Sequence, residues 1–158
     1  SGNPGRGGWS AIILDGEKID KISGSEDNTT NNRMELTAVI SALKYVKDKN
    51  LEIYTDSKYA KDGIEKWISN WKKNGWKTAN KQDVKNKDLW NELDQLNSEK
   101  NIQWNWVKGH ANNQYNNMGS EFGQVHLQIY TSRSRSLVKK IIAQDICEFV
   151  RPSRFCYS

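Results

Sequence analysis

The first regular pattern along the chain is a pair of strand-like segments separated by a turn. Residues 9–14 are mostly apolar with two β-branched positions, and residues 18–24 follow after Asp15 and Gly16. Short β-branched runs joined by Asp-Gly are typical of antiparallel hairpins. The pattern therefore predicts a β-hairpin over residues 9–24.

A helical pattern follows the hairpin. Apolar residues recur at helical spacing between Met34 and Val46, and the polar run Thr30-Asn31-Asn32 precedes them. Side chains of these types cap helix N-termini by accepting hydrogen bonds from the first backbone N–H groups. We predict a helix from this run to about Lys47, with Glu35 in its first turn.

Strand and helix patterns alternate over the rest of the first 123 residues. We predict a strand over residues 51–55, a helix running from Asp56-Ser57 towards Trp67, and a helix from residue 88 to about 97. Ile102, Trp104 and Trp106 alternate with polar residues in a further strand, and a polar loop over 108–117 leads to a short helix. This order predicts an α/β fold with a mixed sheet flanked by helices.

The composition changes near Gly123. Seventeen asparagines and all seven tryptophans precede this residue, whereas residues 124–158 contain neither. The change predicts one domain over residues 1–123 and a tail over 124–158 of separate origin, such as a frameshifted, fused or vector-derived segment. Within the tail, residues 124–131 alternate like a strand and residues 137–149 read as an amphipathic helix.

The net positive charge indicates the kind of partner that the chain binds. The net charge of +5 and pI near 9.1 favour a polyanion, either a nucleic acid or an anionic membrane surface. No apolar run is long enough to span a bilayer, so we expect a soluble, cytoplasmic monomer. Cys147 and Cys156 lack the spacing of metal or redox motifs.

Three sequence blocks occur in a fixed order: TTNNRMEL at residues 29–36, YTDS at 54–57 and WVKGH at 106–110. Together with the glycine-rich opening (residues 2–8) and the lysine- and tryptophan-rich run at 67–78, they resemble the type 1 ribonuclease H family. The resemblance covers residues 1 to about 123. It implies a ribonuclease H-like sheet and an endonuclease that cleaves the RNA strand of RNA–DNA hybrids.

The resemblance also implies a two-metal site built from four acidic residues, of which Glu35 and Asp56 match the second and third. Ser120 stands where the family has the fourth, and the chain begins at Ser1, after the position of the first. We therefore expect weak binding of Mg²⁺, or of Mn²⁺ in its place, by Glu35 and Asp56, and little or no activity. His110 matches a histidine that aids proton transfer or product release. The alternative interpretation of both carboxylates is a favourable place near a helix N-terminus.

The substrate-binding positions of this chain match the family better than its catalytic positions do. Seven lysines and one acidic residue occur between Lys66 and Lys87, which suits salt-dependent binding of phosphates. The alternative is a solvated charged face with packed tryptophans. The residues that match hybrid-binding positions of the family are Asn3, Thr30, Asn31, Asn32, Lys58, Trp67, Trp71, Lys72, Lys73, Trp76, Lys77 and Asn86.

The family's first strand would be central in the sheet, and we expect the chain to lack it because the sequence begins in the turn that follows it. Residues 124–131 resemble that strand, so we hypothesise that they fold back into its place, with Ser132 where a carboxylate is required. Three functions then remain open: an impaired ribonuclease H, an inert module that binds hybrids or duplexes, and a truncated product without function.

Overall fold

The computed structural model describes residues 5–16, 18–107 and 138–146, with residues 144–146 described by their backbone. Ten helices and strands occur within these ranges. In chain order they are β1 (Gly5–Asp15), β2 (Lys18–Thr29), α1 (Asn31–Tyr45), β3 (Asn50–Thr55), α2 (Lys58–Asp62), the π-helical turn η1 (Gly63–Trp67), α3 (Ile68–Lys73), α4 (Lys87–Glu99), β4 (Asn101–Trp106) and β5 (Lys139–Ile146).

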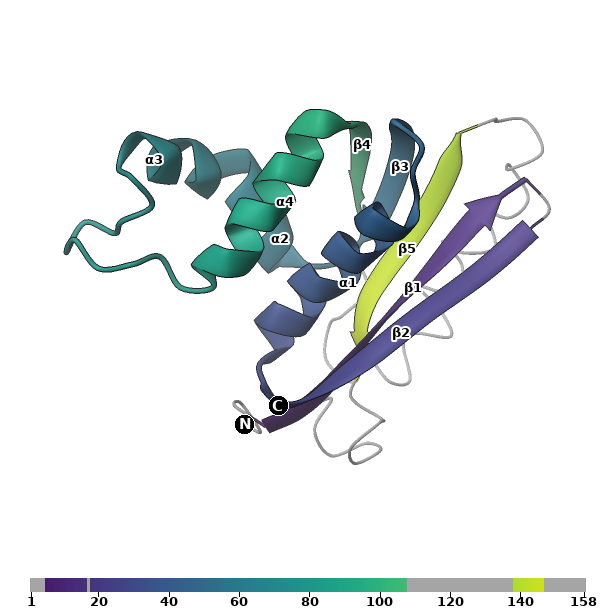
Figure 1. Ribbon diagram of the computed structural model, residues 1–158, viewed down its shortest axis with the longest axis horizontal. Coiled ribbons are helices and arrows are strands. Elements are labelled where there is room, and N and C mark those ends of the chain that lie inside the picture. The colour runs from purple at the N-terminus through teal and green to yellow at the C-terminus, as the bar shows by residue number, and fades with distance from the viewer. Residues whose placement is uncertain (1–4, 17, 108–137, 147–158) are drawn as a thin grey trace.

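The strands form one five-stranded sheet in the order β2-β1-β5-β3-β4. β1 pairs antiparallel with β2, and β3 pairs parallel with β4. The predicted hairpin, the mixed sheet and the flanking helices are therefore confirmed, and the hairpin strands are longer than expected. α1 and α4 lie side by side over the sheet, whereas α3 projects away from it (Figure 1).

The centre of the sheet is filled by the tail. β5 lies between β1, to which it is antiparallel, and β3, to which it is parallel, and Ile141 is opposite both Ile13 and Ile53. The expectation that the sheet lacks a strand at this position is therefore wrong. The tail does supply a strand at this position, but the hypothesis that residues 124–131 occupy it is wrong, because Lys139–Ile146 lies there. Residues 124–131 and Ser132 lie outside the described residues.

The predicted helix over residues 137–149 is wrong as well, because residues 139–146 form β5. Ile141 and Ala143 face the helices, and Ile142 packs with Leu14 on the opposite face. The apolar run of β5 is only three residues long, Ile141 to Ala143, and periodicity does not separate so short a run from a buried helix segment. Residues on both sides of Gly123 thus share one sheet, and the boundary at 123 stays a prediction of where the family region ends.

The main core lies between the sheet and the helices that cover it. It contains the inward-facing residues of β1, β3 and β5 and the buried faces of α1 and α4. Trp90 of α4 is fully buried, and a Cβ added to Gly63 would lie only 2.0 Å from its Cη2 atom. Glycine at position 63 therefore lets the α2–η1 segment approach α4 closely.

Two details of the helix starts bear on the site. Thr30 caps α1, as predicted, and its Oγ1 accepts a hydrogen bond from the backbone N–H of Arg33. Glu35 is the fifth residue of α1 and lies just beyond the first turn, which holds no acidic residue, so its predicted place in that turn is wrong. Within the described ranges, no helix has the length and apolarity needed to cross a membrane.

Candidate active site and nucleic-acid interface

Asp56 directly follows β3, at the carboxyl end of an inner strand that lies between β5 and the edge strand β4. The next residue, Ser57, caps α2, and its Oγ accepts a hydrogen bond of 3.0 Å from the N–H of Ala60. The carboxylate of Asp56 is therefore not the helix cap, although both of its oxygens are buried. Helix capping therefore does not explain the place of this half-buried aspartate, and its role as a site residue stays a prediction.

Glu35 and Asp56 come from elements that meet at one end of the sheet. The N-terminal end of α1 lies at the same end of the molecule as the carboxyl ends of β3 and β5 (Figure 1). Glu35 is half-buried on α1. Both carboxylates are oxygen ligands of the type that Mg²⁺ prefers.

The fit to a two-metal centre is incomplete in the part of the chain that the structure describes. No group of three or more His, Cys, Asp or Glu side chains lies close enough together there to hold a metal ion. The predicted catalytic His110, and Ser120, lie outside the described residues. How Glu35 and Asp56 would hold a metal ion is therefore treated as part of the proposed function.

β5 adds an acidic residue to this end of the sheet that sequence reasoning missed. Ala143 is opposite Thr55, the residue before Asp56, and two positions later the backbone of Asp145 is opposite Trp9 of β1. Only the strand register reveals this, because Asp145 is 89 residues from Asp56 in the sequence and lies beyond every motif.

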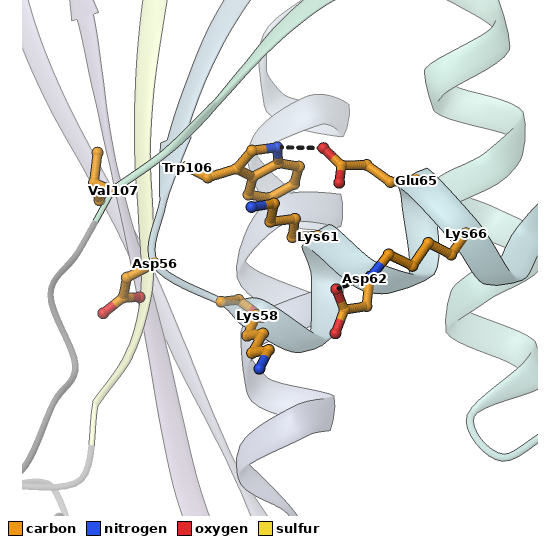
Figure 2. Close-up of a pocket in the computed structure, with 9 residues that line it drawn as sticks. Asp56, Lys58, Lys61, Asp62, Glu65, Lys66, Trp106 and Val107 are labelled. Carbon is orange, nitrogen blue, oxygen red and sulfur yellow. Dashed lines mark hydrogen bonds and ion pairs between the residues drawn. The ribbon is translucent and has the colours of Figure 1, made fainter.

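A pocket of about 520 Å³ opens beside Asp56, and Figure 2 shows how its side chains lie. Trp106 Nε1 donates to Glu65 at 3.1 Å, and Lys66 lies 3.8 Å from Asp62. The residues that line the pocket are Asp56, Ser57, Lys58, Lys61, Asp62, Glu65, Lys66, Trp106 and Val107.

The free cations of this pocket are Lys58 and Lys61, which have no ion-pair partner among the described residues. Lys58 is exposed at the start of α2, as its predicted role in hybrid binding requires. Lys61 and Glu65 were not predicted as site residues. They carry no sequence signal, since their place in the pocket depends on how α2 and η1 pack beside β4.

The lysine-rich segment forms a protrusion that consists of α3 and the loop to α4 (Figure 1). Lys72 pairs with Asp94 at 3.3 Å, Lys77 pairs with Asp83, and Lys73 is exposed without an ion pair in the described ranges. The protrusion therefore offers positive charge, although part of it is neutralised locally.

The predicted tryptophans form an aromatic cluster at the base of this protrusion. The ring centroids of Trp67 and Trp71 lie 5.7 Å apart, those of Trp71 and Trp76 lie 6.0 Å apart, and Trp71 also contacts Trp90 at 5.5 Å. Trp67 is 37% exposed. This packing accounts for the tryptophans structurally, and their contact with nucleic acid stays a prediction.

Arg33 joins two of the predicted phosphate-binding residues, Thr30 and Asn86. Its backbone N–H donates to Thr30 Oγ1 at 3.2 Å, and its Nη1 donates to Asn86 Oδ1 at 3.0 Å. Asp88 pairs with the same guanidinium, and this hydrogen bond raises the pKa of Arg33 and lowers the pKa of Asp88. Asn31 is half-buried and Asn32 is exposed beside them, whereas Asn3 lies outside the described residues.

Comparison with known proteins agrees with this arrangement. The sequence model of the RNase H family matches residues 1–124. Ribonuclease H of Francisella philomiragia is 56% identical over 121 residues, which cover 76% of this chain and 80% of that protein. Ribonuclease H of Wolbachia pipientis wMel is 57% identical over 117 residues, which cover 73% and 81%.

Solved structures give the same result for the fold. LC9-RNase H1, described as a type 1 RNase H with the type 2 active-site motif, superposes with a TM-score of 0.51 at 25% identity and covers 80% of this chain and 74% of that one. A foamy viral protease-reverse transcriptase in complex with an RNA/DNA hybrid superposes with a TM-score of 0.53 at 18% identity, over 75% and 15% of the two chains. This chain therefore belongs to the RNase H family and is a ribonuclease H-type enzyme.

Proposed function

We propose that the chain binds RNA–DNA hybrids and hydrolyses their RNA strand slowly, with Mg²⁺ or Mn²⁺ held by Glu35 and Asp56. The observation that carries the proposal is the half-buried Asp56 at the end of β3, whose carboxylate oxygens are buried and do not cap α2, because Ser57 caps that helix. The relatives named ribonuclease H and the hybrid in the foamy viral complex support the same substrate. Action as a cytoplasmic monomer is part of this proposal.

In this proposal the chain's own residues bind and orient the hybrid. Lysines of the protrusion and Lys58 attract its phosphates, and release of counterions makes the affinity salt-dependent. Thr30 and Asn86 would hold the DNA strand, and short side chains such as Asn31 and Asn32 would meet the 2′-hydroxyl groups of RNA. These contacts would bring one RNA phosphate to the end of the sheet that carries Asp56.

The chemistry at that phosphate depends on few groups. A bound divalent ion supplies an activated water and stabilises charge on the leaving oxygen. Glu35 and Asp56 would hold it, and His110 would accept or donate a proton near neutral pH. Because two carboxylates neutralise less of the charge of two divalent ions than four do, we propose weak metal binding and slow turnover.

The test uses a fluorescently labelled RNA–DNA hybrid and the full chain. We expect binding that weakens as salt is raised, and slow cleavage of RNA that requires Mg²⁺ or Mn²⁺. Asp56→Asn should abolish the cleavage and leave the affinity within about twofold, because it removes a metal ligand but no phosphate contact. Equal affinity for hybrid and for double-stranded DNA would contradict the proposed substrate.

The second candidate function is an inert module that binds hybrids or duplexes. It is favoured by the lack of a group of three metal-binding side chains among the described residues. Salt-sensitive binding without cleavage at any Mg²⁺ or Mn²⁺ concentration would select this function over hydrolysis.

A further inference from the structure

Arg33 is anchored between the N-terminal ends of α1 and α4, and the proposed function gives it no role so far. Its guanidinium meets Asp88 in a paired contact, with Nη1 3.2 Å from Oδ1 and Nη2 3.1 Å from Oδ2. The same Nη1 donates to Asn86 Oδ1 at 3.0 Å. Two parallel N–H···O bonds fix the plane of a guanidinium, so Asp88 sets the direction from which Arg33 approaches Asn86.

Asn86 has an unusual conformation for a residue at a helix start. Its backbone is left-handed, with φ 60° and ψ 32°, and although it is the N-cap of α4 its side chain makes no capping bond. Instead, Nδ2 donates to the hydroxyl of Tyr59 at 3.1 Å, and Trp90 Nε1 donates to the same hydroxyl at 3.1 Å. The amide is thus held by side chains from two other elements.

This network fixes which way the Asn86 amide points. A guanidinium has donors only, so the amide oxygen must face Arg33 and the NH₂ group must face away from it. An amide NH₂ carries two N–H donors, and Tyr59 takes one of them. The second is oriented as a donor, which suits an anion, whereas a reversed amide would present its oxygen and repel one.

We propose that Arg33 is a positioning residue of the nucleic-acid interface, which, anchored by Asp88, holds the amide of Asn86 with an N–H donor towards a phosphate of the bound hybrid. The inference rests on the proposed function. Arg33 also donates its backbone N–H to Thr30, so it contacts both residues that we assign to that phosphate. Because their pairing raises the pKa of Arg33 and lowers that of Asp88, both partners stay charged at neutral pH.

The experiment measures the dissociation constant for a labelled RNA–DNA hybrid at constant salt. We expect Arg33→Ala, Asp88→Asn and Asn86→Ala each to weaken binding roughly tenfold, the loss expected for one hydrogen bond to a charged group. Arg33→Ala should have little further effect in the Asn86→Ala background, because both changes remove the same contact.

Asp88→Asn distinguishes positioning from direct binding. It keeps the positive charge of Arg33 and removes only its anchor, so a direct contact of Arg33 with phosphate predicts unchanged or tighter binding. That result would overturn the inference. Asp88 is largely exposed, so this variant also keeps the inference testable where Arg33→Ala fails to fold.

Lys44→Ala is the matched control, because Lys44 also joins α1 to α4, through an ion pair of 2.7 Å with Glu92, without contacting Asn86. We expect its affinity to stay within about twofold of the unaltered chain, as for an exposed ion pair. A loss as large as that of Arg33→Ala would show that the network acts only through helix packing and would refute positioning.

A modified hybrid then locates the phosphate. A single uncharged methylphosphonate in place of the contacted DNA phosphate should weaken binding of the hybrid to the unaltered chain. With that modified hybrid, Arg33→Ala should cause no further loss of affinity. If Arg33→Ala weakened binding equally for hybrids with the methylphosphonate at every tested position, the inference would be contradicted. Failure of the unaltered chain to bind hybrids would instead refute the proposed function. Binding that Asn86→Ala leaves unchanged would refute this inference and the assigned contact of Asn86, while hybrid binding by the chain would stand.

Discussion

Replacement of Ile141 by alanine tests whether the tail completes the domain. Ile141 is fully buried in the middle of β5, opposite Ile13 of β1 and Ile53 of β3, and it belongs to the main core. The substitution removes three carbon atoms, worth about 2.4 kcal/mol at roughly 0.8 kcal/mol for each buried CH₂ group. A cavity enclosed by two strands and a helix cannot close fully, which raises the expected loss of unfolding free energy to about 3 to 4 kcal/mol.

The assay is urea unfolding followed by tryptophan fluorescence. With a slope of about 2 kcal/mol per molar urea, the midpoint should fall by roughly 1.5 to 2 M without a change in slope. Ile19→Ala is the control, because Ile19 is 46% exposed on the edge strand β2, and it should cost less than about 1 kcal/mol. Equal effects of the two substitutions would show that β5 does not occupy the centre of the sheet.

Three further outcomes can be measured. Gly63→Ala should lower the unfolding free energy by about 1 to 3 kcal/mol in the same assay, because its Cβ would overlap the ring of Trp90. Asp88→Asn should destabilise the protein at pH 7 but not near pH 2. The pKa of Asp88 is lowered in the folded protein, so this carboxylate contributes stability above the unfolded-state pKa of about 3.9, and that stability is lost as the pH falls through the folded-state pKa. Burial raises the pKa of Tyr54 to about 12, so its phenolate absorbance should develop there, and its contribution to stability should be lost as the pH rises from about 10 towards that value.

Much of the fold followed from local patterns. The hairpin, α1, β3, α4 and β4 were predicted within a few residues, because each shows alternation or helical spacing and has turn or capping residues at its ends. The place of Asp56 at the end of β3 also followed, since a strand pattern directly precedes it. Glu35 lies just beyond the first turn and not within it, because the sequence does not define which of several polar residues begins the helix.

The site residues that sequence reasoning missed are those without a local signal. Arg33 was read only as part of a motif, and its contacts with Asn86 and Asp88 span 53 and 55 residues of the chain. Lys61 and Glu65 enter the pocket through the packing of α2 and η1. Such contacts depend on how separate elements are oriented, which no pattern of adjacent residues specifies.

The amino-acid sequence by itself determined the family, the α/β class and the lysine-rich segment that we propose as the interface, because motif order, hydrophobic period and charge are properties of the chain. Only the tertiary structure decided that residues 139–146 complete the sheet. The physical reason is that strand pairing joins segments distant in sequence through backbone hydrogen bonds common to all strands. A strand buried on both faces also lacks the alternation of apolar and polar residues from which a strand is predicted.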